Sequence, residues 1–134
     1  MYPIDDNNDL NSLIGLRVKA FRCVFNEGMK LTSEQFSHLL DITREQLGNY
    51  ENGRSNLPVS VLLKLYKRGA NPVYIISGEG DLFANNKVGI DLRNRILQKE
   101  VNYMESVTLI TKEPMKADIK MTKIKAAAGK IIVK

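Results

Sequence analysis

The stretch LTSEQFSHLLDITREQLGNYENG, residues 31–53, decides the fold, because it contains one helix-start signal twice. Thr32 and Thr43, 11 residues apart, can each cap the N-terminus of a helix. The glutamine three residues after each threonine, Gln35 or Gln46, can return a hydrogen bond to the cap and complete a capping box. A spacing of 11 residues leaves room for one short helix and a tight turn. The stretch therefore predicts two helices in a helix-turn-helix arrangement.

Helices are also indicated on both sides of this pair. Residues 10–26 place apolar side chains at three- and four-residue steps, the stripe of an amphipathic helix: Leu10, Ile14, Val18, Phe21 and Phe25. Asn52-Gly53 ends the second helix of the pair. A further helix is expected from Pro58 to Gly69 and a short one from Val73 to Ser77, because a proline stands near each start.

The rest of the chain is expected to form a linker and a C-terminal segment. Residues 84–90 are interpreted as a linker after a first domain over residues 10–83. A helix is expected over about residues 91–106, within a C-terminal segment 91–134. Its apolar residues follow steps of seven, four and three, the narrow seam along which helices pair, and are expected to form an oligomer interface: Ile90, Leu97, Val101 and Met104. From Thr111 onward the pattern fits a strand or a loose tail.

The composition is that of an ordinary globular protein, with 134 residues of which 43% are hydrophobic and 26% charged. A single cysteine excludes an internal disulfide, and the acidic N-terminus lacks the layout of a signal peptide, so a cytoplasmic location is expected. No apolar run is long enough to span a membrane. The net charge of +5 is uneven, with −3 on residues 1–9, +4 on residues 10–75 and +5 on residues 112–134. Basic zones suit nucleic acid, although a solvated lysine-rich end explains the last zone equally well.

Residues 14–83 resemble the DNA-binding domain of the Cro/repressor class, the XRE-type regulators of lambda-like phages and bacteria. The matching stretches are Ile14-Gly15-Leu16-Arg17-Val18-Lys19, Leu31 through Gly53, and Asn71 through Gly80. The resemblance implies an all-α, five-helix, lambda-repressor-like domain followed by a short C-terminal helix or tail. Asp41 stands where the family usually has the glycine of the turn, and aspartate tolerates left-handed backbone angles better than most residues.

The second helix of the pair is expected to read bases in the major groove of double-stranded DNA. Arg44 can donate two hydrogen bonds to guanine, Glu45 can accept one from cytosine, and Asn49 suits adenine. The family's base-reading positions fall on these same residues, although Glu45 can instead repel phosphate and act against wrong sites. Contacts to the DNA backbone, or caps beside it, are expected from Thr32, Ser33, Thr43, Gln46, Arg54 and Asn56. Gln46 either reaches the DNA or stays in its capping box, which is the plainer interpretation.

Two further predictions concern the first helix. The resemblance implies a structural ion pair between Arg17 and Glu51, of a kind that fixes geometry more than it stabilises. Lys19 and Arg22 are candidates for phosphate contact, or else they belong to a solvated face.

These features favour a DNA-binding transcriptional regulator, namely a repressor that binds a palindromic operator as a homodimer, with no cofactor and no metal. Two alternatives stay open: an antitoxin-like protein-interaction module that autoregulates its operon, and a nucleic-acid binder without sequence preference. An enzyme is not expected, since His38 is the only histidine and lacks catalytic partners in the pattern. Cutting the chain after Asn86 is expected to leave a folded monomer, because the proposed oligomer seam follows that point.

Overall fold

The computed structural model describes residues 3–99 and 102–113, with side chains from residue 9 onward. Within these ranges the chain is all-α and contains no named strand, which confirms the expected fold class. Its helices are α1 (Pro3–Phe25), α2 (Ser33–Leu39), α3 (Arg44–Glu51), α4 (Val59–Lys67), α5 (Pro72–Ser77), α6 (Lys87–Gln98) and α7 (Tyr103–Thr111). None of the described helices has both the length and the apolar character needed to cross a membrane.

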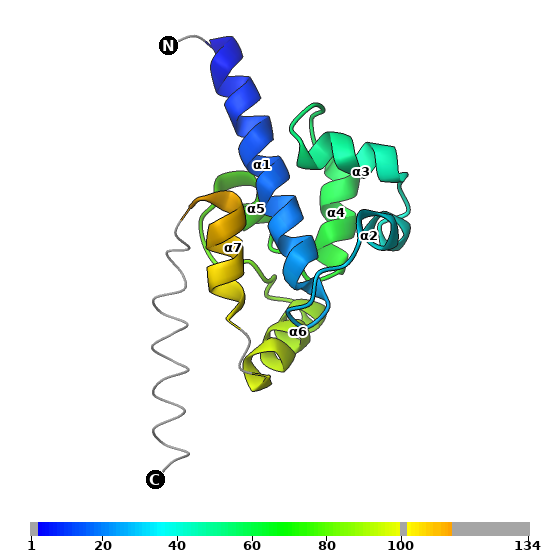
Figure 1. Ribbon diagram of the computed structural model, residues 1–134, viewed down its shortest axis with the longest axis vertical. Coiled ribbons are helices and arrows are strands. Elements are labelled where there is room, and N and C mark those ends of the chain that lie inside the picture. Colours follow the sequence, from blue (N-terminus) through cyan, green and yellow to red (C-terminus); the bar gives the residue numbers. More distant parts are fainter. Residues whose placement is uncertain (1–2, 100–101, 114–134) are drawn as a thin grey trace.

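The helix α1 is the long central element of the fold (Figure 1). The helices α2, α3 and α4 lie on one side of it, α5 and α7 on the other, and α6 beyond its C-terminal end. Its most extensive contact is with α7, followed by the contact with α3. Gly15 permits the close approach to α3, because a Cβ there would overlap the backbone oxygen of Tyr50. Every one of the described helices contributes side chains to a single buried core, among them Phe21, Phe36, Leu47, Leu65, Tyr74, Ile96 and Val107.

Both repeated helix-start signals are confirmed. The Thr32 hydroxyl accepts from the Gln35 N–H over 3.1 Å, and the Gln35 side chain accepts from the Thr32 N–H over 3.0 Å. The Thr43 and Gln46 pair makes the same two bonds over 3.0 Å and 2.8 Å. Asp41, in the turn between them, takes a φ of 55°, the left-handed conformation expected for the family's glycine position. The local sequence thus determines the shape of the helix-turn-helix unit.

Two helix starts differ from the sequence expectation. The first helix begins at Pro3 rather than at Leu10. The added turns are polar, so no apolar stripe announces them, but a proline in the first turn followed by acidic residues is itself a helix-start signal. Pro58 is the N-cap of α4 rather than its first residue, whereas Pro72 does begin α5, capped by Asn71.

The expected single helix over residues 91–106 is wrong. The helix α6 ends at Gln98, and α7 starts again at Tyr103 with Asn102 as its cap. The Asn102 side chain accepts from the Glu105 N–H over 3.2 Å, and such a cap favours a new helix over continuation of the old one.

The expected oligomer seam is divided by this break. Ile90 and Leu97 lie on α6 and Met104 lies on α7, while Val101 falls outside the described residues. Leu97 and Met104 pack against the core of their own chain. The seam is therefore not one free stripe.

Residues 84–90 lie within the fold rather than forming a separate linker. The Ala84 N–H donates to the Gly69 carbonyl over 2.7 Å, and Ala84 and Gly89 are both buried. The Asn86 side chain caps α6 by accepting from the Gly89 N–H over 2.7 Å. The helices α6 and α7 then add four buried side chains to the common core: Leu92, Ile96, Tyr103 and Val107. Through residue 113 the described C-terminal segment thus shares the core of the preceding helices, and the expected strand or tail after it lies outside the described residues.

Candidate nucleic-acid interface

The helix α3 separates its side chains onto two faces. Leu47 is fully buried and Glu51 nearly so, and both face the core. Arg44 and Glu45 in the first turn are exposed, and Asn49 is half-buried. The three predicted base-reading residues thus lie on one short helix. The two charged ones, Arg44 and Glu45, remain exposed to solvent. Gln46 is engaged in the capping box, which agrees with the plainer of its two interpretations.

The N-terminus of α2 presents a second group of predicted contact residues. Thr32 is exposed and Ser33 is half-buried at the first helical position. The Thr32 hydroxyl already accepts a hydrogen bond from the Gln35 N–H, so its own O–H remains a possible donor to an anion.

The loop between α3 and α4 provides a third group. Arg54 and Asn56 are exposed there, and Gly53 gives the loop its turn with a φ of 72°. The Asn11 side chain of α1 donates to the Asn56 Oδ1 over 2.7 Å. This bond uses the acceptor of the Asn56 amide and leaves its NH2 group as the donor that a phosphate needs. Asn11 is a positioning residue that the sequence analysis missed, because no local pattern links residues 45 positions apart.

The expected pair of Arg17 with Glu51 is wrong, since Glu51 pairs with Arg22. The Arg22 Nε lies 2.8 Å from one Glu51 carboxylate oxygen, and its NH2 lies 3.0 Å from the other. Its NH1 donates to the Leu31 carbonyl over 2.7 Å. Five residues turn an α-helix by about 140° beyond a full turn, so Arg17 and Arg22 face different neighbours. Arg22 is therefore neither a solvated residue nor a free phosphate donor.

The environment of Arg22 keeps this pair ionic. Burial lowers the pKa of the Arg22 guanidinium, but the hydrogen bonds and negative charge of Glu51 outweigh burial, so its pKa is raised. The arginine therefore stays charged at physiological pH. The pair joins α1, the start of α2 and the end of α3, which orients the helix-turn-helix unit on the core.

A family model described as helix-turn-helix matches residues 25–67, from the end of α1 to the end of α4. Residues 25–67 are thus similar to the helix-turn-helix of Cro/repressor-type regulators. The match supports a DNA-binding transcriptional regulator. No curated protein and no solved structure is significantly similar to the chain.

Arg17 joins three segments of the chain on the side of α1 away from α3. Its NH1 donates to the carbonyls of Ile75 and Ile76 at the C-terminal end of α5, over 3.3 and 3.1 Å. Its Nε and NH2 lie 3.1 and 3.0 Å from the two carboxylate oxygens of Glu113, just after α7. The Arg17 side chain is 4% exposed. The helix α7 is thus fixed to α1 by a buried charge.

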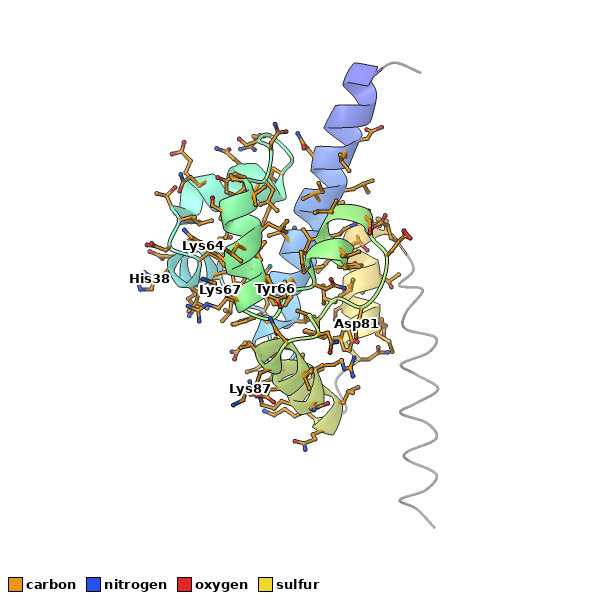
Figure 2. All side chains as sticks on the ribbon, turned by 180° about the vertical axis from the view of Figure 1, so that it is seen from behind. His38, Lys64, Tyr66, Lys67, Asp81 and Lys87 are labelled. Carbon is orange, nitrogen blue, oxygen red and sulfur yellow. The ribbon has the colours of Figure 1, made fainter. Side chains whose placement is uncertain are left out.

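Basic side chains of α4 brace the turn of the helix-turn-helix unit. The Lys64 Nζ lies 3.5 Å from the Asp41 carbonyl, and Arg68 donates to the Leu39 carbonyl over 3.1 Å. Figure 2 shows Lys64, Lys67 and Lys87 along one flank of the molecule, with His38 of α2 beside them. Lys64 and Arg68 thus have a structural role, because they hold the end of α2 and the turn that follows it.

Proposed function

We propose that the regulator reads double-stranded DNA with the first turn and the outward face of α3. Arg44 donates two hydrogen bonds to a guanine, Glu45 accepts from a cytosine, and Asn49 bonds to an adenine. The observation that carries the proposal is the division of α3 into a buried face and an exposed charged face, with the helix start fixed by a capping box. An α-helix of this kind fits the width of the major groove.

Contacts to the DNA backbone orient the domain on its site. The α2 start and the loop after α3 offer hydroxyl, amide and guanidinium donors, and such donors fix register without reading sequence. The residues proposed for these contacts or for the caps beside them are Thr32, Ser33, Thr43, Gln46, Arg54 and Asn56. Gln46 acts from within its capping box, by holding the first turn of α3 in place.

The regulator acts as a repressor that binds a two-fold symmetric operator as a dimer. One helix-turn-helix domain contacts only a few base pairs, whereas a dimer places two recognition helices about 34 Å apart, one DNA turn. The bound dimer then blocks RNA polymerase from the promoter. DNA next to the encoding gene is the first candidate for the operator.

The apolar face of α4 and α5 is the proposed dimer interface, with a second copy of this chain as its occupant. Large apolar side chains stay exposed there, from 37% to 80%: Val59, Leu63, Tyr66, Val73 and Ile76. A shallow groove of about 280 Å³ runs between them, lined by Val59, Leu62, Leu63, Tyr66 and Pro72. A monomer rarely exposes such a patch without a partner. A two-fold axis would pair the face with itself, so that each copy covers the same residues of the other.

Selection of binding sites from a random DNA library tests the reading role of Arg44. Arg44→Ala is expected to cost about 1–3 kcal/mol on the selected site and to relax the preference at one base pair of each half-site. The fold should be unaffected, because the side chain is exposed. Arg95→Ala removes the same charge from an exposed position on α6 and serves as the control. An unchanged base preference in Arg44→Ala would refute the assignment.

Sedimentation of the full chain tests the interface. Leu63→Glu places a charge in the proposed contact and is expected to give a monomer that still folds. Leu109→Glu changes a comparably exposed leucine on α7 and is expected to remain a dimer. If Leu63→Glu sediments as the wild-type dimer, the α4–α5 face is not the interface.

A further inference from the structure

A pocket of about 330 Å³ lies between the loop that joins α5 to α6 and one side of α6. Its lining combines apolar with polar residues: Phe83, Ala84 and Ile90 with Asp81, Asn85 and Arg93. Small-molecule sites in proteins have this mixed lining and volumes of about 300–1,000 Å³, so the pocket is at the small end of their range. Figure 1 shows α6 beyond the C-terminal end of α1 and the α3–α4 loop toward the other end. The pocket is therefore separate from the proposed DNA contacts.

The polar part of the pocket is built around one ion pair. The Arg93 Nη1 lies 2.8 Å from the Asp81 Oδ2. Asp81 is held in place, because its Oδ1 accepts from the Phe83 N–H over 3.2 Å and lies 3.5 Å from the Tyr103 hydroxyl. Figure 2 shows Asp81 beside α7, the helix to which Tyr103 belongs. The side chains of Arg93 and Asp81 are 37% and 18% exposed, so the pair is not sealed in the core.

Arg93 uses its guanidinium differently from the other arginines in the described ion pairs. Arg17 and Arg22 each hold a carboxylate with Nε and Nη2, the edge that matches two carboxylate oxygens. Arg93 holds Asp81 through Nη1 alone, and its buried Nε has no hydrogen-bond partner among the described residues. A buried donor without a partner is rare in proteins, because it has lost its bonds to water. The Nε–Nη2 edge of Arg93 is therefore still able to take a carboxylate.

We propose that this pocket binds a small α-amino acid. The carboxylate of the ligand bonds to Nη2 of Arg93, which is not buried, and a small rotation of the side chain adds the bond to Nε. The ammonium group of the ligand bonds to the Asp81 Oδ2, which has a second lone pair. The ligand's side chain packs on Phe83 and Ile90.

The presence of both charges in the pocket selects a zwitterion. A ligand with only a carboxylate is attracted by Arg93 but repelled by Asp81, and a ligand with only an ammonium group meets the reverse. An α-amino acid carries the two charges on neighbouring atoms and satisfies both residues at once. The alternative is that the ion pair only fastens the loop to α6 and takes no ligand.

The experiment follows the amide peaks of the full chain by NMR while L-alanine, L-valine, L-leucine or L-glutamine is added. At least one of these is expected to shift the peaks of Asn85, Gly89 and Ile90 along a saturable curve, with a Kd at or below about 1 mM. The same compound without its amino group or without its carboxyl group should bind at least about tenfold more weakly. For valine these analogues are isovalerate and isobutylamine.

Two variants separate the ligand site from a purely structural ion pair. Arg93→Lys keeps a positive charge beside Asp81 but lacks the two-pronged edge, so it should fold and bind the amino acid about tenfold more weakly. Ile90→Trp fills the pocket without changing its charge and should also lose binding. Arg95→Lys makes the matched change at an exposed position of α6 and should bind like wild type.

The proposal is overturned if none of the four amino acids gives a saturable shift. It is equally overturned if the analogues with one charge, or both Arg93→Lys and Ile90→Trp, bind as tightly as the amino acid binds to wild type. Because the experiment contains no DNA, its result is independent of the proposed function.

Discussion

Removing all residues after Asn86 is expected to unfold the protein. The cut takes away four core side chains that are each 4% exposed or less: Leu92, Ile96, Tyr103 and Val107. Burying one large apolar side chain contributes roughly 1.5–3 kcal/mol, so the loss is about 6–12 kcal/mol. That equals most of the total stability of an ordinary domain, about 5–15 kcal/mol. Arg17 also loses its ion-pair partner Glu113. This prediction replaces the expectation from the sequence, which was a folded monomer.

Thermal melting by circular dichroism, with amide peak dispersion in NMR spectra, compares fragments 1–86 and 1–113 with the full chain. Fragment 1–113 keeps α6, α7 and the Arg17–Glu113 pair, so it should melt cooperatively near the full-length temperature. Fragment 1–86 should show neither a cooperative transition nor dispersed peaks. A cooperative melt of fragment 1–86 within a few degrees of the full chain would show that α6 and α7 are not part of the core.

Four further substitutions test the packing around α3. Leu47→Ala should lower the free energy of unfolding by about 2–5 kcal/mol in urea titrations, because the side chain is fully buried. A loss near zero would mean that the inward face of α3 is misassigned. Glu51→Gln should cost about 3–5 kcal/mol in the same assay, since it leaves the buried Arg22 guanidinium without its carboxylate, and wild-type stability would contradict a buried ion pair. Gly15→Ala should lower the melting temperature, because its methyl group meets the α3 backbone. Gly48→Ala faces open space and should raise the free energy of unfolding by up to about 1 kcal/mol. Equal effects of the two substitutions would argue against the close crossing of α1 and α3.

The helix-turn-helix unit could be predicted because its determinants are local. Each capping box involves residues three positions apart, Thr32 with Gln35 and Thr43 with Gln46, so the chain itself shows where both helices begin. The left-handed turn at Asp41 depends on one residue's backbone preference. The division of α3 into inward and outward faces follows from helical periodicity alone. The roles of its outward residues in reading DNA stay predictions.

The remaining contacts could not be predicted because they join distant parts of the chain. Periodicity shows that two arginines lie on α1, but only the packing of α3 decides that Glu51 meets Arg22. The pairing of Arg17 with Glu113 spans 96 residues, and no local signal marks it. One local signal marks the break between α6 and α7, namely the cap at Asn102. The seven-residue spacing of the apolar residues around it favours one continuous helix and hides this signal.

The attachment of α7 to α1 has a consequence for the nascent chain. The ribosome makes Arg17 early, but its carboxylate partner follows 96 residues later. At about 5–20 residues per second, synthesis of the intervening chain takes roughly 5–20 seconds. During that time α1 lacks the helix with which it makes its most extensive contact. Chains that terminate before α7 in translation would therefore fail to fold, so that folding waits until the chain through Glu113 has been made.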